Sequence, residues 1–256
     1  MTVLFLVPTL GERPDLLDRS LTSIRAQGVD VDLVVVAPER ANVDDLVARH
    51  RARRVHDPGR GISAALNAGL AAAAPETSYV AWLGDDDLLS EQSLRTTVAA
   101  LDANPEAVLA YGWCDYVDEG DRVVFRSHAG RLAKAILTFG PNLIPQPGSL
   151  MRLDAVQAVG GIDESVRLAM DLDLFLRLRR RGQIVSIPQT LACFRWHAGS
   201  STVANGEASM EESDRLRMKY MPRAAAAVYR YARWPGRWAL TAAKRRADRN
   251  AARSRS

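Results

Sequence analysis

The chain has 256 residues, of which 47% are hydrophobic, and it carries 34 basic and 30 acidic side chains. This composition is ample for a packed core and excludes a disordered chain. No apolar run approaches the roughly 18–20 residues that cross a bilayer, and the N-terminus lacks the basic start of a signal peptide, so we expect a cytoplasmic protein. The two cysteines, Cys114 and Cys193, lie far apart in strand-like surroundings, which favours buried thiols over a zinc site or a disulfide.

Charge is distributed unevenly along the chain. From residue 219 to the end there are 11 Lys or Arg and one acid, whereas residues 1–218 hold 23 basic and 29 acidic side chains. Trp234 and Trp238 lie among the arginines of the tail, and aromatic and cationic side chains together suit an anionic membrane surface. The alternative is a helical tail, residues 204–256, that packs on the body or on a second subunit. We do not expect nucleic acid to be its partner.

The first half alternates apolar runs with helix-like segments, and the runs span residues 3–8, 31–38 and 78–84. This alternation predicts an α/β fold with a mostly parallel, Rossmann-like sheet and helices on both faces. Ligands of such sheets bind beyond the carboxyl ends of the strands, where residues 8–13 and 84–87 lie. Ser90 is the expected N-cap of the helix that follows.

The second half has a different pattern. Residues 107–127 are typical of two strands joined by a turn at Asp118–Asp121. Residues 171–182 predict a strong helix, and two further strands are expected at residues 183–188 and 190–199.

Three consecutive carboxylates, Asp85, Asp86 and Asp87, follow an apolar run. Adjacent negative charges repel one another and lose water near a core, so a metal ion, nearby Arg or Lys side chains, or open solvent must compensate them. At a strand end, a carboxylate pair suits Mn²⁺ or Mg²⁺, which takes few protein oxygens and completes its shell with waters and a diphosphate. Gly59 and Gly61 do not follow the first strand and no Walker sequence occurs, which disfavours a dinucleotide site and a P-loop.

Five motifs in a fixed order resemble those of the inverting, GT-A-fold nucleotide-sugar glycosyltransferases of family 2. The motifs are VPTLGERPDLLDRSLTSIRAQ, GISAALNAGL, WLGDDDLLSEQSL, GGIDESVRLAMDLDLFLRL and FRWHAGSST. The resemblance covers roughly residues 2–203. It implies a GT-A domain over residues 1–203, with a nucleotide-sugar half at 1–105 and an acceptor half at 106–203.

The resemblance also implies a catalytic base. Asp171 matches the carboxylate that takes a proton from the acceptor hydroxyl while its oxygen attacks the anomeric carbon. Asp171 begins a helix, where the dipole favours the ionised form that a base requires. From the residues alone, the favoured interpretation is that Asp171 is an N-cap and Asp173 a surface charge paired with Arg177.

The donor site implied by the resemblance consists of residues at the strand ends and in the middle motif. It comprises Pro8, Thr9, Glu12, Asn67, Asp85 and Asp86. Two positions depart from the family pattern. Glu39 alone remains where an acidic pair usually reads the base, so UDP- and dTDP-sugars both stay open. Leu66 stands where the family often has arginine, a charge that Arg60 could supply instead.

The resemblance implies a metal site formed by Asp85, Asp87 and His197, and it makes Arg195 a candidate to offset phosphate charge. The histidine has an equally good alternative as a structural hydrogen-bond partner. The candidate acceptor contacts, for which core or turn roles are the alternative, are Trp113, Asp115 and Gln146.

The function expected on these grounds is metal-dependent transfer of a sugar from a UDP- or dTDP-sugar to a hydroxyl of a glycan or lipid-linked acceptor. Such an enzyme would serve cell wall or polysaccharide biosynthesis, at the inner face of the membrane if the tail binds lipid. One rival is a sugar nucleotidyltransferase, which would release pyrophosphate. The other is a non-catalytic protein that binds nucleic acid or membrane through its tail, and salt-dependent binding without nucleotide-sugar affinity would favour it.

Overall fold

The computed structural model describes residues 1–128, 130–197 and 206–229. Its strands are β1 (Thr2–Pro8), β2 (Val31–Ala37), β3 (Arg53–His56), β4 (Thr77–Trp82), β5 (Leu88–Leu89), β6 (Ala107–Val117), β7 (Val123–Ser127), β8 (Leu150–Arg152) and β9 (Gln183–Arg195). Its helices are α1 (Pro14–Arg25), α2 (Asp44–Arg49), α3 (Ile62–Ala71), α4 (Ser93–Asp102), α5 (Arg131–Ile136), α6 (Leu153–Ala158), α7 (Met170–Leu178) and α9 (Gly206–Tyr220).

One mixed sheet of nine described strands organises the molecule, in the order β3-β2-β1-β4-β8-β6-β9-β5, with β7 paired to β6. The strands β3, β2, β1 and β4 are parallel, as the alternation in the first half predicts. The short β8 runs antiparallel to both β4 and β6, and β6 is parallel to β9. The second half of the sheet therefore contains both parallel and antiparallel pairs, because β8 runs opposite to the strands on either side of it.

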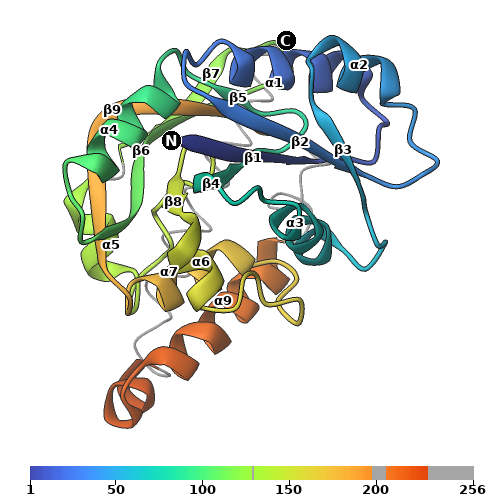
Figure 1. Cartoon of the computed structure of the whole chain (residues 1–256). Helices are drawn as coiled ribbons and strands as arrows, with labels where there is room; N and C mark the ends of the chain where they lie inside the picture. Colours follow the sequence, from blue (N-terminus) through green and yellow to red (C-terminus); the bar gives the residue numbers. More distant parts are fainter. Residues whose placement is uncertain (129, 198–205, 230–256) are drawn as a thin grey trace.

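Helices cover both faces of the sheet, which confirms the predicted fold class (Figure 1). Strand β1 shows the cause, because its successive side chains point to opposite faces. Leu4 and Leu6 belong to the core shared with α3, α6 and α7. Val3 and Phe5 belong to the core shared with α1 and α4.

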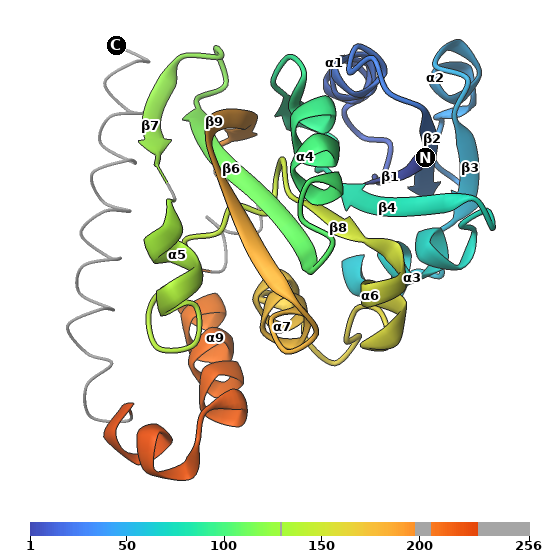
Figure 2. The ribbon, with the colours of Figure 1, turned by 60° about the vertical axis from the view of Figure 1, so that its left-hand side comes forward.

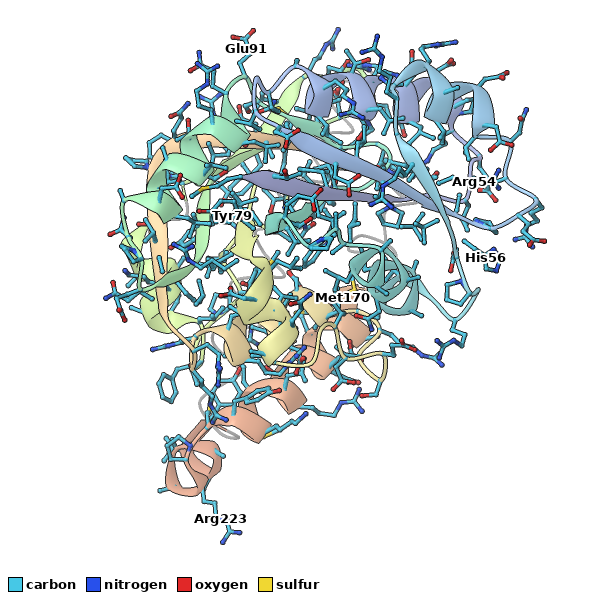
Figure 3. All side chains as sticks on the ribbon, viewed as in Figure 1. Arg54, His56, Tyr79, Glu91, Met170 and Arg223 are labelled. Carbon is cyan, nitrogen blue, oxygen red and sulfur yellow. The ribbon has the colours of Figure 1, made fainter. Side chains whose placement is uncertain are left out.

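The side chains separate the interior of the sheet from its β3 edge (Figure 3). Tyr79, on the central strand β4, is fully buried and its hydroxyl hydrogen-bonds Asp102 of α4. Arg54 and His56, on β3, lie at the periphery of the view. Charged side chains on an outer strand disfavour pairing with another chain.

Three expectations about local structure need correction. Residues 183–195 form one strand, β9, instead of two, because it pairs with β6 along its whole length. Helix α4 begins at Ser93 and its N-cap is Gln92, in the left-handed region at φ 59°. Ser90 instead donates its backbone N–H to Leu191 of β9. Of the two cysteines, Cys114 is buried and Cys193 is half-buried, and both are free.

The described part of the basic tail is helical, as predicted. Helix α9 lies beside α7, and its inner residues are buried (Figure 2). Trp234, Trp238 and the expected domain boundary at residue 203 lie outside the described residues. None of the described helices is long and apolar enough to cross a membrane.

Candidate active site at the strand ends

The three aspartates occupy a tight turn between β4 and β5. The backbone N–H of Asp87 donates to the carbonyl of Gly84 at 3.2 Å, which closes the turn. A Cβ on Gly84 would lie 2.9 Å from Asp87 Oδ2 and 3.1 Å from Asp86 Oδ1. A side chain at this position would therefore displace these two carboxylates from the positions they hold above the strand end.

The guanidinium of Arg13 bridges two of these carboxylates. Its Nη2 lies 2.5 Å from Asp85 Oδ1, and its Nη1 lies 2.5 Å from Asp86 Oδ2. The second oxygen of Asp85 accepts a 2.6 Å hydrogen bond from the Thr9 hydroxyl. His197 Nε2 lies 2.7 Å from Asp86 Oδ2 and 3.1 Å from Arg13 Nη1. Arg13 is thus the cation that compensates the exposed side of the cluster.

Arg13 is the main residue that the sequence analysis missed. It stands immediately before Pro14, the first residue of α1, in the loop after β1. A signal was present, because this loop and the aspartates both lie at strand ends and an adjacent Arg or Lys was one of the three ways to compensate them. The choice among those three ways required the folded loop.

The negative charge of Asp87 is compensated by a different group, and this side chain is buried. Its Oδ1 accepts a 2.8 Å hydrogen bond from the backbone N–H of Arg195. Burial, and next the neighbouring charge of Asp86, raise the pKa of Asp87 to about 8. Burial also raises the pKa of Asp85, although the Thr9 hydrogen bond and the Arg13 charge oppose it.

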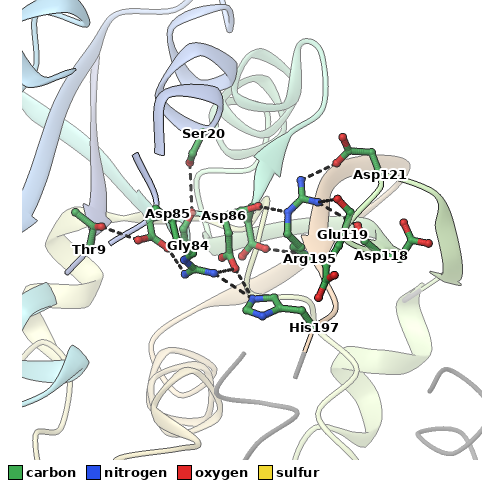
Figure 4. Close-up of polar contacts among 12 residues, drawn as sticks. Thr9, Ser20, Gly84, Asp85, Asp86, Asp118, Glu119, Asp121, Arg195 and His197 are labelled. Carbon is green, nitrogen blue, oxygen red and sulfur yellow. Dashed lines mark hydrogen bonds and ion pairs between the residues drawn. The ribbon is translucent and has the colours of Figure 1, made fainter. Parts of the chain in front are cut away.

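Arg195 does not face the open side of the cluster, so its predicted role toward phosphate is wrong. The side chain is only 3% exposed. Its Nη1 donates to the carbonyls of Asp118 and Glu119 at 3.0 and 3.2 Å, and its Nη2 lies 2.6 Å from Asp121 Oδ1. Arg195 therefore ties the turn between β6 and β7 to the floor of the aspartate cluster (Figure 4).

Asp171 lies in the first turn of α7, where the sequence places a helix start. Its Oδ2 accepts a 3.0 Å hydrogen bond from Asn142 Nδ2. Burial raises the pKa of the Asp171 carboxyl, while backbone N–H groups at the helix start, the charge of Arg217 and the Asn142 hydrogen bond oppose the rise. The expected pair of Asp173 with Arg177 is present at 2.6 Å, but Asp173 is fully buried and is not a surface charge.

Tyr116 of β6 is close to both groups of carboxylates. Burial is the main reason that the pKa of the Tyr116 hydroxyl is raised, followed by Cys114. The charges of Asp87 and Asp171 raise it further. The ring packs against Phe125, Phe194 and Trp196, with centroids 5.4, 5.4 and 5.9 Å away. Tyr116 therefore belongs to an aromatic cluster formed by β6, β7 and the end of β9, within electrostatic range of Asp87 and Asp171.

The remaining candidate donor residues are dispersed. Pro8 is half-buried at the end of β1, whereas Glu12 and Glu39 are exposed. Arg60 pairs with Glu164 at 2.8 Å, beside a surface cavity of about 390 Å³ between α3 and the segment before α7. Asn67 donates to the Ile162 carbonyl at 2.8 Å and accepts from its N–H at 2.9 Å, so its amide anchors that segment.

The three candidate acceptor residues have protein partners. Asp115 binds Arg126 through two hydrogen bonds of 2.7 and 2.9 Å. Trp113 contacts His128 edge to face, with ring centroids 4.7 Å apart. Gln146 donates to the Trp82 carbonyl at 2.7 Å, at the end of the strand that precedes the aspartates. Of the three, Gln146 is the one joined directly to the aspartate turn.

The predicted metal ligands do not converge in this arrangement. His197 contacts Asp86, whereas Asp85 and Asp87 are bonded to Thr9, Arg13 and the backbone of Arg195. Across residues 1–128, 130–197 and 206–229, no group of three His, Cys, Asp or Glu side chains is placed to hold a metal ion. As arranged, Arg13 and Thr9 occupy the two oxygens of Asp85 and His197 contacts Asp86, so these side chains would have to move before they could hold a divalent cation.

Solved structures show the same fold. The crystal structure of S. aureus TarS 1-349 has a TM-score of 0.63 at 16% identity, covering 86% of this chain and 65% of that chain. The same protein in complex with UDP gives a TM-score of 0.65 at 15% identity, covering 90% and 70%. Its complex with UDP-GlcNAc gives 0.63 at 15% identity, covering 90% and 71%. These likenesses confirm the GT-A architecture.

Sequence comparisons give the family. The curated "Uncharacterized protein y4gI" of Sinorhizobium fredii (strain NBRC 101917 / NGR234) is 29% identical over 212 residues, which are 78% of this chain and 23% of that protein. The chain therefore spans about a quarter of the length of this relative and less than two thirds of the first TarS structure. The family model described as Glycosyl transferase family 2 matches residues 5–158, more than half of the chain. The chain therefore belongs to glycosyl transferase family 2.

Proposed function

We propose that the protein is an inverting glycosyltransferase that moves a sugar from a UDP- or dTDP-sugar to a hydroxyl of a glycan or lipid-linked acceptor. The observation that carries this proposal is that Asp87 of the aspartate cluster and Asp171, a carboxylate at a helix start, both lie within electrostatic range of Tyr116. Family membership supports the reaction class. The UDP and UDP-GlcNAc complexes of TarS, a protein of the same fold, support a nucleotide-sugar donor.

On the donor side, Arg13 is well suited to a diphosphate. The Arg13 side chain is 39% exposed while it bridges Asp85 and Asp86, so it can rotate toward a phosphate oxygen without being uncovered first. A guanidinium binds phosphate through two parallel hydrogen bonds. Thr9 keeps Asp85 oriented at the end of β1. In this proposal Pro8, Glu12 and Glu39 line the nucleoside part of the site, and Arg60 and Asn67 border it.

On the acceptor side, Asp171 acts as the general base. It removes the proton of the acceptor hydroxyl while that oxygen attacks the anomeric carbon, and the nucleoside diphosphate leaves from the opposite face. Asn142 holds one oxygen of the carboxylate, which fixes the direction of the other. Trp113, Asp115 and Gln146 remain the proposed acceptor contacts, and the partners described above orient their side chains.

Metal dependence on Mn²⁺ or Mg²⁺ remains a separate proposal. A bound divalent cation would supply charge stabilisation to the leaving diphosphate. Asp85, Asp87 and His197 would hold it only after Arg13 leaves Asp85 and Asp86 and His197 leaves Asp86. Binding at the inner face of a membrane, and a role in cell wall or polysaccharide biosynthesis, are likewise proposals that depend on the tail and the acceptor.

The test combines donor binding with turnover. A thermal-shift screen of UDP, UDP-GlcNAc and a panel of UDP- and dTDP-sugars identifies the donor, since a ligand stabilises the folded state that binds it. Asp171→Asn is expected to bind that donor normally and to lose release of nucleoside diphosphate. The matched control is Asp154→Asn, because Asp154 also lies in the first turn of a helix and accepts a backbone N–H, at 2.7 Å.

Three outcomes would contradict the proposal. Near-normal turnover by Asp171→Asn would remove Asp171 from the role of base. Release of pyrophosphate instead of nucleoside diphosphate would favour a nucleotidyltransferase. Binding to nucleic acid or anionic vesicles without any nucleotide-sugar affinity would favour a non-catalytic protein.

A further inference from the structure

Helix α9 is hydrogen-bonded to the chain immediately before the candidate base. The carboxylate of Glu212 accepts backbone hydrogen bonds from Arg167 at 3.2 Å, Leu168 at 2.6 Å and Ala169 at 2.8 Å. Three consecutive N–H groups on one carboxylate form a charge-assisted arrangement that is stronger than neutral hydrogen bonds. Glu212 therefore fixes the backbone that ends two residues before Asp171.

A second contact holds α7 from the other side of Asp171. The hydroxyl of Tyr220, the last residue of α9, donates to Asp173 Oδ1 at 2.7 Å. Asp173 Oδ2 is bound to Arg177, whose Nη1 donates to the carbonyls of Val159 and Gly161 at 2.8 and 2.7 Å. The middle of α9, through Glu212, and its last residue, Tyr220, thus hold the chain on both sides of Asp171, and Figure 2 shows α9 lying beside α7.

The same helix places a buried cation near Asp171. Arg217 is 5% exposed and pairs with Asp214 at 3.5 Å, a long separation for an ion pair. In the described part of the chain its Nε has no hydrogen-bond partner. Burial has the largest effect on the pKa of the Asp171 carboxyl and raises it. The charge of Arg217 opposes this rise. Helix α9 therefore contributes charge as well as position to the candidate base.

We infer that α9 is part of the catalytic unit and that Glu212 is a positioning residue for Asp171. The inference rests on the proposed role of Asp171 as general base. Helix α9 lies beyond residues 5–158, the region that the family model matches, and in the segment that the sequence suggests is a basic tail. One of its acidic residues, Glu212, makes the contact.

The test compares Glu212→Ala and Glu212→Gln with Glu211→Gln in the full chain. Glu211 is the matched control because it is exposed on the same helix one residue earlier. Hydrogen exchange of residues 167–172 reports the backbone, and release of UDP from UDP-GlcNAc, or from the donor found by thermal shift, reports turnover. We expect faster exchange in Glu212→Ala and a loss of about 10–100-fold in kcat, since small displacements of a catalytic group cost that much.

The donor KM should stay within about twofold, because the uniform binding of the donor does not involve α9. Glu212→Gln keeps one acceptor oxygen, so its loss should be smaller than that of Glu212→Ala, and it serves as the variant if the alanine protein does not fold. The Glu211→Gln protein should match the wild type in exchange and kcat.

Three results would overturn the inference. One is unchanged exchange of residues 167–172 in the Glu212 variants, whatever the turnover. Another is faster exchange with normal kcat, including a fall in kcat/KM that comes only from a rise in KM. The third is a fall in kcat that loss of folded protein explains. Failure of the proposed function is a distinct result, because Asp171→Asn would then remain active. Inactive Asp171→Asn beside fully active Glu212 variants would reject only the role of α9.

Discussion

The aspartate cluster and helix α7, which carries the proposed base, both place carboxylates within electrostatic range of Tyr116, but they are held in place differently. The cluster lies at the ends of β4 and β1, and its cations, Arg13 and Arg195, come from the loop after β1 and the end of β9. The carboxylate of Asp171 is held by Asn142 and by the start of its own helix, and that helix is fastened by α9. The contacts of the aspartate cluster mainly compensate charge, whereas those of α7 mainly fix the position of Asp171. Substitutions in the two sites should therefore affect different properties of the protein.

The largest expected effect follows from replacing the proposed base on α7. Asp171→Asn should lower turnover by about 10²–10⁴-fold, the usual contribution of a general base. Donor affinity, measured by calorimetric titration of the nucleotide, should be unchanged because the aspartate cluster is intact. An equal fall in donor affinity would show that the two sites are not separate.

The next effect is on stability. Arg195→Met should lower the free energy of unfolding by about 3 kcal/mol, because it leaves the buried carbonyl of Asp118, the part-buried carbonyl of Glu119 and the carboxylate of Asp121 without their charged partner. Urea denaturation of the two proteins measures the difference. Arg13→Gln provides the comparison, since the more exposed Arg13 should affect stability by less than about 1 kcal/mol. Equal losses of stability in the two variants would contradict the distinction between the buried Arg195 and the more exposed Arg13.

A smaller effect tests the competition between Arg13 and a metal. Arg13→Gln should bind Mn²⁺ about tenfold more tightly than the wild type in the absence of donor, because it removes the positive charge that occupies Asp85 and Asp86. Isothermal titration of Mn²⁺ alone gives the measurement. Unchanged affinity, or no Mn²⁺ binding in either protein, would argue that the cluster is served by arginine and not by a metal.

The smallest effect is a shift in pH dependence. Burial raises the pKa of Asp171, so the acid limb of kcat should lie above the ordinary range of an aspartate, and activity should fall as the pH falls through it. The Asn142 hydrogen bond favours the ionised carboxylate. Asn142→Ala should therefore move the acid limb to higher pH, which a pH profile of kcat would show. A shift to lower pH would contradict this assignment of the hydrogen bond.

Sequence reasoning predicted the parallel half of the sheet, the location of the three aspartates and the helix that carries Asp171. These follow from apolar periodicity and from motifs that are continuous in the chain. The roles of Arg13, Arg195 and Glu212 did not follow from it, because each acts on a partner 40 or more positions away. Arg195 illustrates the physical limit, since its sequence neighbours suggest a phosphate contact and only the fold directs the side chain into the turn after β6.

The pairing of β9 with β6 has a consequence for the order in which the protein folds. These two strands are separated by some seventy residues in the chain, yet β9 delivers Arg195 to Asp87. Contacts between distant segments form late because the intervening loop must be closed first. A growing chain that ends before β9 would carry the aspartate turn without this partner. The donor side of the site, although encoded near the N-terminus, is therefore completed only after most of the chain has been synthesised.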